Sequence, residues 1–215
     1  MFSKWFTKKD TKQAPKAPEV MGLYLGGSFE LDDLKLKLIE PELTIEGAAR
    51  QHLIQAVGEA HLDTGGKILR FYTDDDAFLQ VVLDGGDSES HVTDVKLWYF
   101  YETQTVGSSA QWKTLIEQQV SQPQYAVNGV TFSRVWNAIG DTSPPVAMTE
   151  KTYELDGDIS ETDQFVMLYE RDISNTEIET LLVCAEEKII NSNHDRCLVL
   201  STGFDISPAD IRING

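Results

Sequence analysis

The chain has 215 residues, of which 41% are hydrophobic and 9% aromatic, and its formal net charge is −17 at pH 7. This composition is too apolar for a disordered chain, and the sequence lacks the run of about 18 apolar residues that a membrane-spanning helix needs. The strong negative charge excludes the basic surface that is typical of nucleic-acid-binding proteins, so we expect no nucleic-acid partner.

The N-terminal segment, residues 1–19, is a basic head followed by a linker that contains Pro15 and Pro18. Lysines interrupt the head, so the apolar core of a secretory signal is missing and we expect a cytoplasmic protein, with a peripheral position at the inner membrane as the alternative. Three aromatic residues share one helical face, and lysines surround them. These residues are Phe2, Trp5 and Phe6, with Lys4, Lys8 and Lys9. Such a head can contact an anionic membrane weakly, dock on a partner or on the acidic body, or lack ordered contacts.

The first strand predicted in the body lies at residues 34–38, where leucines alternate with lysines. Residues 44–63 fit either a helix or a strand, and we favour a strand from Leu53 because Gly58 disfavours a helix by about 1 kcal/mol relative to alanine. Short turns then separate three clearer strands. They lie at residues 67–73, 77–83 and 92–105. Sequential strands joined by such turns usually pair antiparallel, which predicts a meander.

An aromatic run within the third of these strands, Trp98 to Tyr101, predicts that both faces of the strand are covered, because successive side chains point to opposite faces. The apolar spacing then becomes helical at residues 108–122, with Ser108 as the N-cap. Since the apolar residues of this segment share one face, we expect a single amphipathic helix that packs on a sheet.

The second half of the chain returns to strand patterns. The predicted strands are residues 125–136, 146–155, 164–171, 179–190 and 196–201, of which 179–190 also fits a helix. Ser207 and Pro208 predict a short C-terminal helical turn. The predicted fold class is therefore α+β, with predominantly antiparallel β-sheet in meanders, one amphipathic helix near the middle and the terminal turn. We expect one β-rich domain over residues 20–215, and the alternative is two β subdomains, 20–107 and 124–215, around the helix.

Two segments of the body resemble a known family. Arg70–Gln80 (RFYTDDDAFLQ) and Ser143–Thr149 (SPPVAMT), together with Leu25-Gly26-Gly27, are similar to a bacterial family of unknown function typified by YjfK. The family has no established activity, so the resemblance implies no catalytic residues. Its members are similar in context to proteins encoded beside a homologue of the phage-shock membrane-binding protein, so the resemblance weakly implies a role near the membrane or in envelope stress.

The acidic turn Asp74-Asp75-Asp76 is the candidate metal site. In an extended backbone Asp74 and Asp76 point to the same side, about 7 Å apart at Cα, so their carboxylates can converge on Ca²⁺. A hard cation needs about six oxygen ligands or more, and a solvated hairpin end is the alternative interpretation. The two cysteines, Cys184 and Cys197, lack the spacing of a zinc site or a disulfide framework and are predicted to be free thiols.

The sequence contains no recognisable catalytic motif, and we expect no cofactor. The GxSxG, HExxH, P-loop and dinucleotide-binding patterns are all missing. We therefore expect a non-enzymatic accessory or interaction protein that contacts a protein partner or, weakly, an anionic membrane. The alternatives are a metal-binding module or metal-dependent hydrolase that uses Asp74 and Asp76, and a structural subunit of an oligomer.

Overall fold

The computed structural model describes residues 16–63, 65–136 and 141–214. The strands are β1 (Ser28–Leu31), β2 (Gln51–His61), β3 (Lys67–Thr73), β4 (Ala77–Leu83), β5 (Val92–Thr105), β6 (Gln124–Val127), β7 (Val130–Arg134), β8 (Val146–Glu154), β9 (Ile159–Asp172), β10 (Ile178–Ile190), β11 (Asn193–Asp205) and β12 (Ile211–Asn214). The helices are α1 (Asp33–Ile39) and α2 (Ser109–Thr114), which continues as a π-helical turn at Leu115–Gln119. Short 3₁₀ turns span Glu40–Glu42, Glu89–His91 and Pro208–Asp210.

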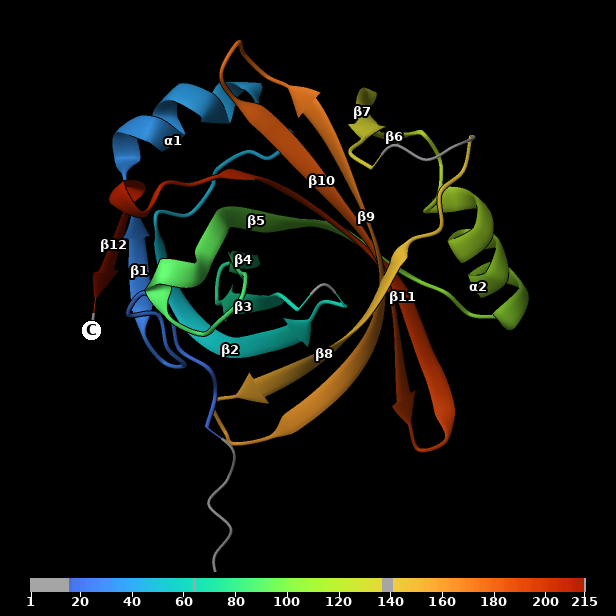
Figure 1. Cartoon of the computed structure of the whole chain (residues 1–215). Coiled ribbons are helices and arrows are strands. Elements are labelled where there is room, and N and C mark those ends of the chain that lie inside the picture. The colour runs from blue at the N-terminus through green and yellow to red at the C-terminus, as the bar shows by residue number, and fades with distance from the viewer. Residues whose placement is uncertain (1–15, 64, 137–140, 215) are drawn as a thin grey trace, which may run out of the picture.

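Eight antiparallel strands close into a barrel (Figure 1). Strands β2 to β5 form the expected meander, and β5 then pairs with β11. The ring continues through β10, β9 and β8, and β8 pairs with β2. Each strand of the ring therefore has a partner on both sides, which satisfies its backbone hydrogen bonds. The predominantly antiparallel β-sheet predicted from the sequence is confirmed.

Two layers cover opposite outer faces of the barrel, and α1 and α2 lie on these two sides in Figure 1. The N-terminal layer, residues 17–50, packs apolar side chains such as Leu23, Phe29 and Leu36 on the outer face of β2 to β5. Strands β1 and β12 extend the sheet beside β2. The second layer consists of α2, β6 and β7, and places Leu115 and Phe132 on the outer face of β9 to β11. Trp98 and Tyr99 are buried on opposite faces of β5, as predicted, whereas Phe100 in the same aromatic run is 39% exposed.

The predicted strand at residues 34–38 is wrong, because this segment is helix α1. The carboxylate of Asp32 accepts a hydrogen bond from the Leu34 N–H at 2.8 Å, as an N-terminal capping residue does. Leu36 and Ile39, three residues apart, are buried, whereas Leu34 and Leu38, four residues apart, are 68% and 71% exposed. The alternation of leucine and lysine therefore belongs to a short helix that buries one of its faces.

The expectation of one amphipathic helix is also corrected, since the described residues contain two short helices. In the middle of the chain the predicted N-cap is confirmed, because Ser108 Oγ accepts a hydrogen bond from the Gln111 N–H. The single strand predicted at residues 125–136 is instead the hairpin of β6 and β7. Asn128 and Gly129 both have positive φ angles, 49° and 79°, which form the tight turn that the continuous strand prediction overlooked.

Both ambiguous segments, residues 44–63 and 179–190, contain a strand and no helix among their described residues. Residues 51–61 form β2, and residues 178–190 form β10. The C-terminal helical turn is confirmed as the 3₁₀ turn Pro208–Asp210, with Ser207 Oγ accepting the Ala209 N–H. Within the described residues, no helix is both long and apolar enough to cross a membrane.

Candidate functional site at the barrel mouth

One end of the barrel contains a pocket of about 520 Å³. The acidic turn between β3 and β4 lies at this end of the ring, and so does the turn that joins β10 to β11. We call this pocket the mouth. The described residues that line it are Ala56, Tyr72, Asp76, Phe100, Thr103, Glu150, Thr152, Thr162, Gln164, Glu186, Cys197 and Val199. Its volume is in the range of about 300 to 1,000 Å³ that is usual for small-molecule sites.

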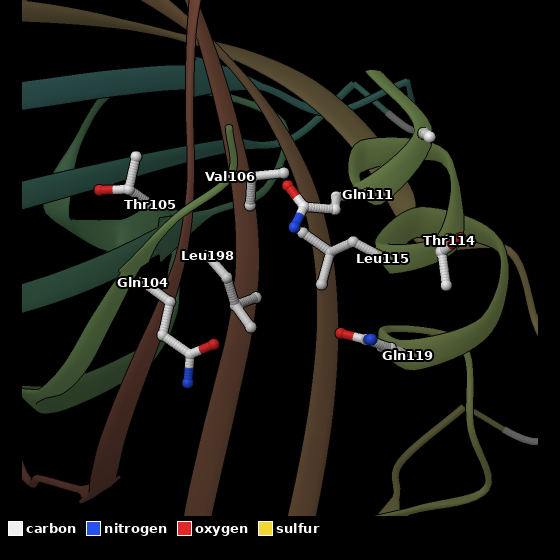
Figure 2. A pocket seen from close by; sticks show the side chains of 9 residues that line it. Gln104, Thr105, Val106, Gln111, Thr114, Leu115, Gln119 and Leu198 are labelled. Atoms are coloured by element: carbon white, nitrogen blue, oxygen red, sulfur yellow. The ribbon is translucent and has the colours of Figure 1, made fainter. Parts of the chain in front are cut away.

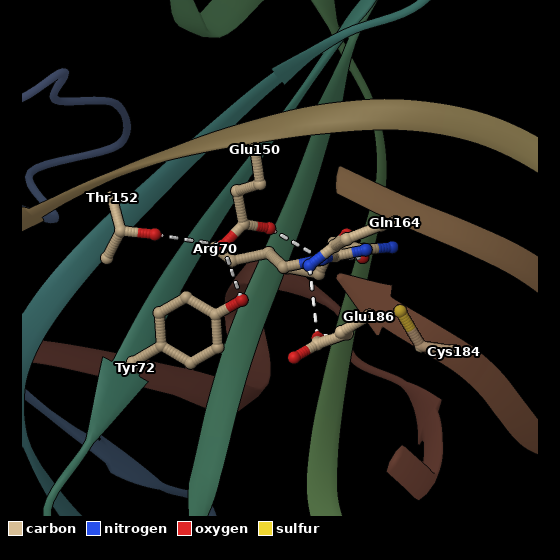
Figure 3. A network of polar contacts seen from close by, with 8 residues as sticks. Arg70, Tyr72, Glu150, Thr152, Gln164, Cys184 and Glu186 are labelled. Carbon is tan, nitrogen blue, oxygen red and sulfur yellow. Dashed lines mark hydrogen bonds and ion pairs between the residues drawn. The ribbon is translucent and has the colours of Figure 1, made fainter. Parts of the chain in front are cut away.

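A buried ion pair forms the floor of the mouth (Figure 3). Arg70 on β3 and Glu150 on β8 are each only 3% exposed, and Arg70 Nη1 lies 2.6 Å from Glu150 Oε2. The same nitrogen donates to Gln164 Oε1 at 2.7 Å, and Arg70 Nε donates to Gln80 Oε1 at 3.1 Å. Glu150 Oε1 accepts the Tyr72 hydroxyl at 2.6 Å. These bonds compensate two buried charges and fix both side chains in place.

Glycine at position 58 makes room for this network. A Cβ at Gly58 would lie 2.6 Å from Glu150 Cδ and 3.1 Å from the Tyr72 ring. The absence of a side chain at this position on β2 therefore allows the carboxylate of Glu150 to pass over β2 and reach Arg70 and Tyr72 on the next strand, β3. Burial and the neighbouring Glu150 raise the pKa of the Tyr72 hydroxyl, which keeps it protonated as a hydrogen-bond donor.

Glu186 on β10 is the second carboxylate of the mouth. It accepts a hydrogen bond from Gln164 Nε2 at 3.2 Å and weak thiol contacts from Cys184 at 3.6 Å and Cys197 at 3.9 Å. Burial, and then repulsion by Glu150, raise the pKa of Glu186, whereas Arg70 opposes the shift. Arg70 forms an ion pair with Glu150, whereas among the described residues the donors to Glu186 are a neutral amide and two thiols.

The two cysteines are free thiols that face the barrel interior. Burial, and then the charge of Glu186, raise the pKa of Cys197 to about 11 and the pKa of Cys184 well above its ordinary value. Because the thiolate rather than the thiol is the nucleophile, these raised pKa values disfavour nucleophilic attack by either cysteine at neutral pH. The arrangement therefore supports binding better than covalent chemistry.

Aromatic rings form one wall of the mouth. The rings of Tyr72 and Phe100 are nearly parallel, with centroids 6.3 Å apart and an interplanar angle of 6°. Phe78 packs beneath them, 5.4 Å from Phe100, and the Arg70 guanidinium lies 5.6 Å from the Phe78 centroid. Phe100 is 39% exposed, so this ring is available to a molecule that enters the mouth.

Comparison with known proteins places the chain in a family. The model of the family described as "Protein of unknown function (DUF2491)" matches residues 1–212. The chain belongs to this DUF2491 family. It is similar to the uncharacterized protein YjfK of Escherichia coli (strain K12), with 27% identity over 223 aligned residues that cover 100% of this chain and 98% of the relative. No solved structure matches the chain. The resemblance to a YjfK-like family of unknown function is thus confirmed.

In this DUF2491 protein, the two candidate metal ligands, Asp74 and Asp76, have different surroundings. Asp74 Oδ1 accepts the backbone N–H of Leu53 at 2.9 Å, so this carboxylate joins the β3–β4 turn to β2. Asp76 lies at the rim of the mouth. Among the described residues, no three or more histidine, cysteine, aspartate or glutamate side chains gather as a metal would require. A metal site at the turn stays a prediction of the sequence.

The predicted membrane or partner contact lies outside the described residues. It consists of Phe2, Lys4, Trp5, Phe6, Lys8 and Lys9. The described chain begins at Lys16, which forms a surface ion pair with Glu19. The role of the head therefore stays a prediction from its sequence.

A second pocket, of about 380 Å³, lies between α2 and the outer surface of the barrel (Figure 2). Gln104 and Leu198 from the strands face Leu115 and Gln119 of the helical segment. None of the described residues that line this pocket is ionisable. The mouth, which combines buried charges with an aromatic wall, is therefore the stronger candidate for a functional site.

Sequence analysis missed the principal residues of the mouth. Arg70, Gln80 and Glu186 stand within strands whose other residues are largely apolar. A charged residue in such a strand is almost never buried unless it has a partner, and this was the available signal. The partners themselves were not recognisable, because Glu150 and Gln164 lie 80 and 94 positions from Arg70.

Proposed function

We propose that this DUF2491 protein is a non-enzymatic accessory protein that binds a small molecule in the mouth of its barrel. The observation that carries the proposal is the pocket at one end of a closed eight-stranded ring, which is lined by both aromatic and carboxylate side chains. The outer face of the ring is packed with apolar side chains on two sides. Barrels of this strand number can hold one small ligand, and barrel mouths are frequent binding sites. The ion pair of Arg70 and Glu150 preorganises the floor.

The chemistry of the lining residues favours binding over catalysis. The thiols of Cys184 and Cys197 are held protonated, and the carboxylate of Glu150 is occupied by Arg70 and Tyr72. The Thr152 hydroxyl lies 3.4 Å from the carboxylate of Glu150, and the Cys197 thiol lies 3.9 Å from that of Glu186. Both distances exceed the reach of about 2.6 to 3.2 Å that is typical of a nucleophile and its base. The accessory role expected from the sequence then becomes that of a sensor or carrier of a small ligand.

Two neighbouring positions on β5 provide a matched test of this proposal. Thr103 lines the mouth, whereas Gln104 lines the pocket beneath α2 on the other face of the strand. A fragment library is screened by saturation-transfer NMR against three proteins: the wild-type full chain, the Thr103→Trp variant and the Gln104→Trp variant. We expect a set of fragments whose signals disappear with Thr103→Trp and persist with Gln104→Trp. Fragment binding that is unaffected by Thr103→Trp would contradict a site in the mouth.

A further inference from the structure

Glu186 is a carboxylate with an incomplete set of partners. Its donors are one neutral amide, from Gln164, and two thiols at 3.6 and 3.9 Å, which are weak donors. Within the part of the chain that the structure describes, no lysine, arginine or histidine forms an ion pair with it. Arg70 directs its closest bonds to Glu150, Gln164 and Gln80 instead.

A partly buried carboxylate without a cation is unfavourable, because few dipoles replace the water that it has lost. Such a group can gain a partner when a ligand carries a positive charge into the mouth. Glu186 also lines the pocket, so a molecule in the mouth can reach it directly. The negative charge of Glu186, which has no cationic partner among the described residues, therefore favours a positively charged ligand.

The remaining walls of the mouth fit an organic cation. The faces of aromatic rings attract cations, and Phe100 and Tyr72 form the wall beside the carboxylates. Hydroxyl oxygens that can accept hydrogen bonds from an ammonium group come from Thr103, Thr152 and Thr162. Ala56 and Val199 provide apolar surface for a hydrocarbon part.

The charges around the mouth also favour a cationic ligand. Among the described residues, the carboxylates of Asp76, Glu150 and Glu186 line the mouth. The guanidinium of Arg70, below them, forms an ion pair with Glu150. The chain as a whole carries a formal charge of −17. Clefts lined by one sign of charge concentrate ligands of the opposite sign. An anionic ligand would meet repulsion both on approach and inside the mouth.

We infer that the ligand of the mouth is a small primary ammonium compound, with its charged nitrogen at Glu186 and its apolar or aromatic part along Phe100. This inference rests on the proposed function and specifies its ligand class. In this arrangement Glu186 binds the charged nitrogen of the ligand. The Arg70–Glu150 pair keeps the floor of the mouth in place. Neutral molecules of the same shape would use the aromatic wall alone and bind more weakly.

The test compares amines with neutral isosteres. Benzylamine, 2-phenylethylamine and 4-phenylbutylamine are titrated into the full chain at pH 7.5, each beside the alcohol of the same carbon skeleton, and binding is followed by ¹H–¹³C NMR of the methyl groups of Val199 and Ala56. The variants are Glu186→Gln, Thr103→Trp and, as a matched surface control, Glu89→Gln, which lies in the exposed turn between β4 and β5 at the other end of the ring. We expect at least one amine to bind about tenfold more tightly than its alcohol, as a charge-assisted hydrogen bond allows.

Glu186→Gln should remove this preference by weakening the amine about tenfold and leaving the alcohol unchanged, while Glu89→Gln changes neither. Thr103→Trp should remove the binding of both compounds. Equal binding of amine and alcohol, or an amine preference that survives Glu186→Gln, would overturn the ligand class and leave the mouth as a site for neutral compounds. If Thr103→Trp changes nothing, or no compound shifts the two methyl groups, the proposed function fails together with this inference. A cooperative thermal unfolding transition of Glu186→Gln establishes that this variant is folded.

Discussion

Gly58 on β2 and Glu150 on β8 fit together in the barrel interior, because a Cβ at position 58 would lie 2.6 Å from Glu150 Cδ. The carboxylate that this glycine admits then accepts bonds from Arg70 and Tyr72. The strand pairing of β2 with β8 brings the two residues together, so the closure of the barrel and the floor of its mouth depend on the same contact.

Substitution of Gly58 by alanine should destabilise the protein. The added methyl group must displace Glu150 or the ring of Tyr72, and overpacking of this kind costs about 1 to 3 kcal/mol. The measurement is the free energy of unfolding in urea. Gly107→Ala is the control, because its nearest neighbour would be the Gln111 Oε1 atom at 3.8 Å, and we expect it to be close to neutral. Equal stability of the two variants would refute the tight fit.

Substitution of Arg70 by methionine should be more costly. It leaves Glu150 buried without its cation, and breaking a buried ion pair in this way costs about 3 to 5 kcal/mol. The double variant Arg70→Met/Glu150→Met should recover much of this loss, since no charge is then left unpaired. Urea unfolding of both variants measures the difference, with exposed Arg212→Met as the control expected within about 0.5 kcal/mol of wild type. Additive losses in the double variant would contradict a coupled pair.

Glu186 should make stability depend on pH. Burial and the nearby Glu150 raise its folded-state pKa above the ordinary value of 4.5. Its contribution to stability is therefore fully present below pH 4.5 and is lost as the pH rises through the folded-state value. Glu186→Gln removes this loss, so we expect the variant to be more stable than wild type at pH 8, by about 1 kcal/mol, and nearly equal at pH 4. Urea unfolding at several pH values checks this, and a difference that does not grow with pH would count against it.

Asp74 should act as a structural residue. Its carboxylate accepts the Leu53 N–H, so Asp74→Ala is expected to lower the free energy of unfolding by about 1 kcal/mol, even in the presence of a chelator. Asp76→Asn, which keeps a residue tolerant of the positive φ of 50°, should be nearly neutral. A melting temperature that rises with Ca²⁺ and no longer does so in Asp76→Asn would instead support the metal-binding alternative.

The basic head should bring the protein weakly to anionic membranes. Deletion of residues 1–15 is expected to reduce co-sedimentation with phosphatidylserine vesicles, because it removes the aromatic face and its lysines. Neutral vesicles, and anionic vesicles at high salt, are the controls, since salt screens the electrostatic part. If the truncated chain sediments as the full chain does, the membrane prediction is wrong and a protein partner is favoured.

The sequence predicted local structure well where alternation and turns coincide. Strands β3, β4 and β5 have the bounds that the pattern indicated, because glycine and aspartate turns separate them clearly. Helix α1 was misread, since five residues of alternating leucine and lysine do not distinguish a strand from one buried helical face. The turn at Asn128-Gly129 was a readable signal that was overlooked.

Closure of the barrel and the composition of its mouth were beyond a reading of local patterns. They depend on the pairing of β5 with β11 and of β2 with β8, and each of these pairs joins strands about a hundred positions apart. Arg70 becomes informative only when Glu150 and Gln164 are known to face it. The acidic turn was recognised, but its relation to the mouth required the hairpin register to be known.

The central claim is that a small molecule occupies the mouth rather than another surface of the barrel. Methyl-resolved NMR of the full chain during titration with the best-binding compound tests this directly. We predict that the methyl signals of Val199 and Ala56, inside the mouth, shift with saturation, while those of Leu198 and Leu115, in the pocket beneath α2, stay in place. Shifts confined to Leu198 and Leu115 would contradict the account.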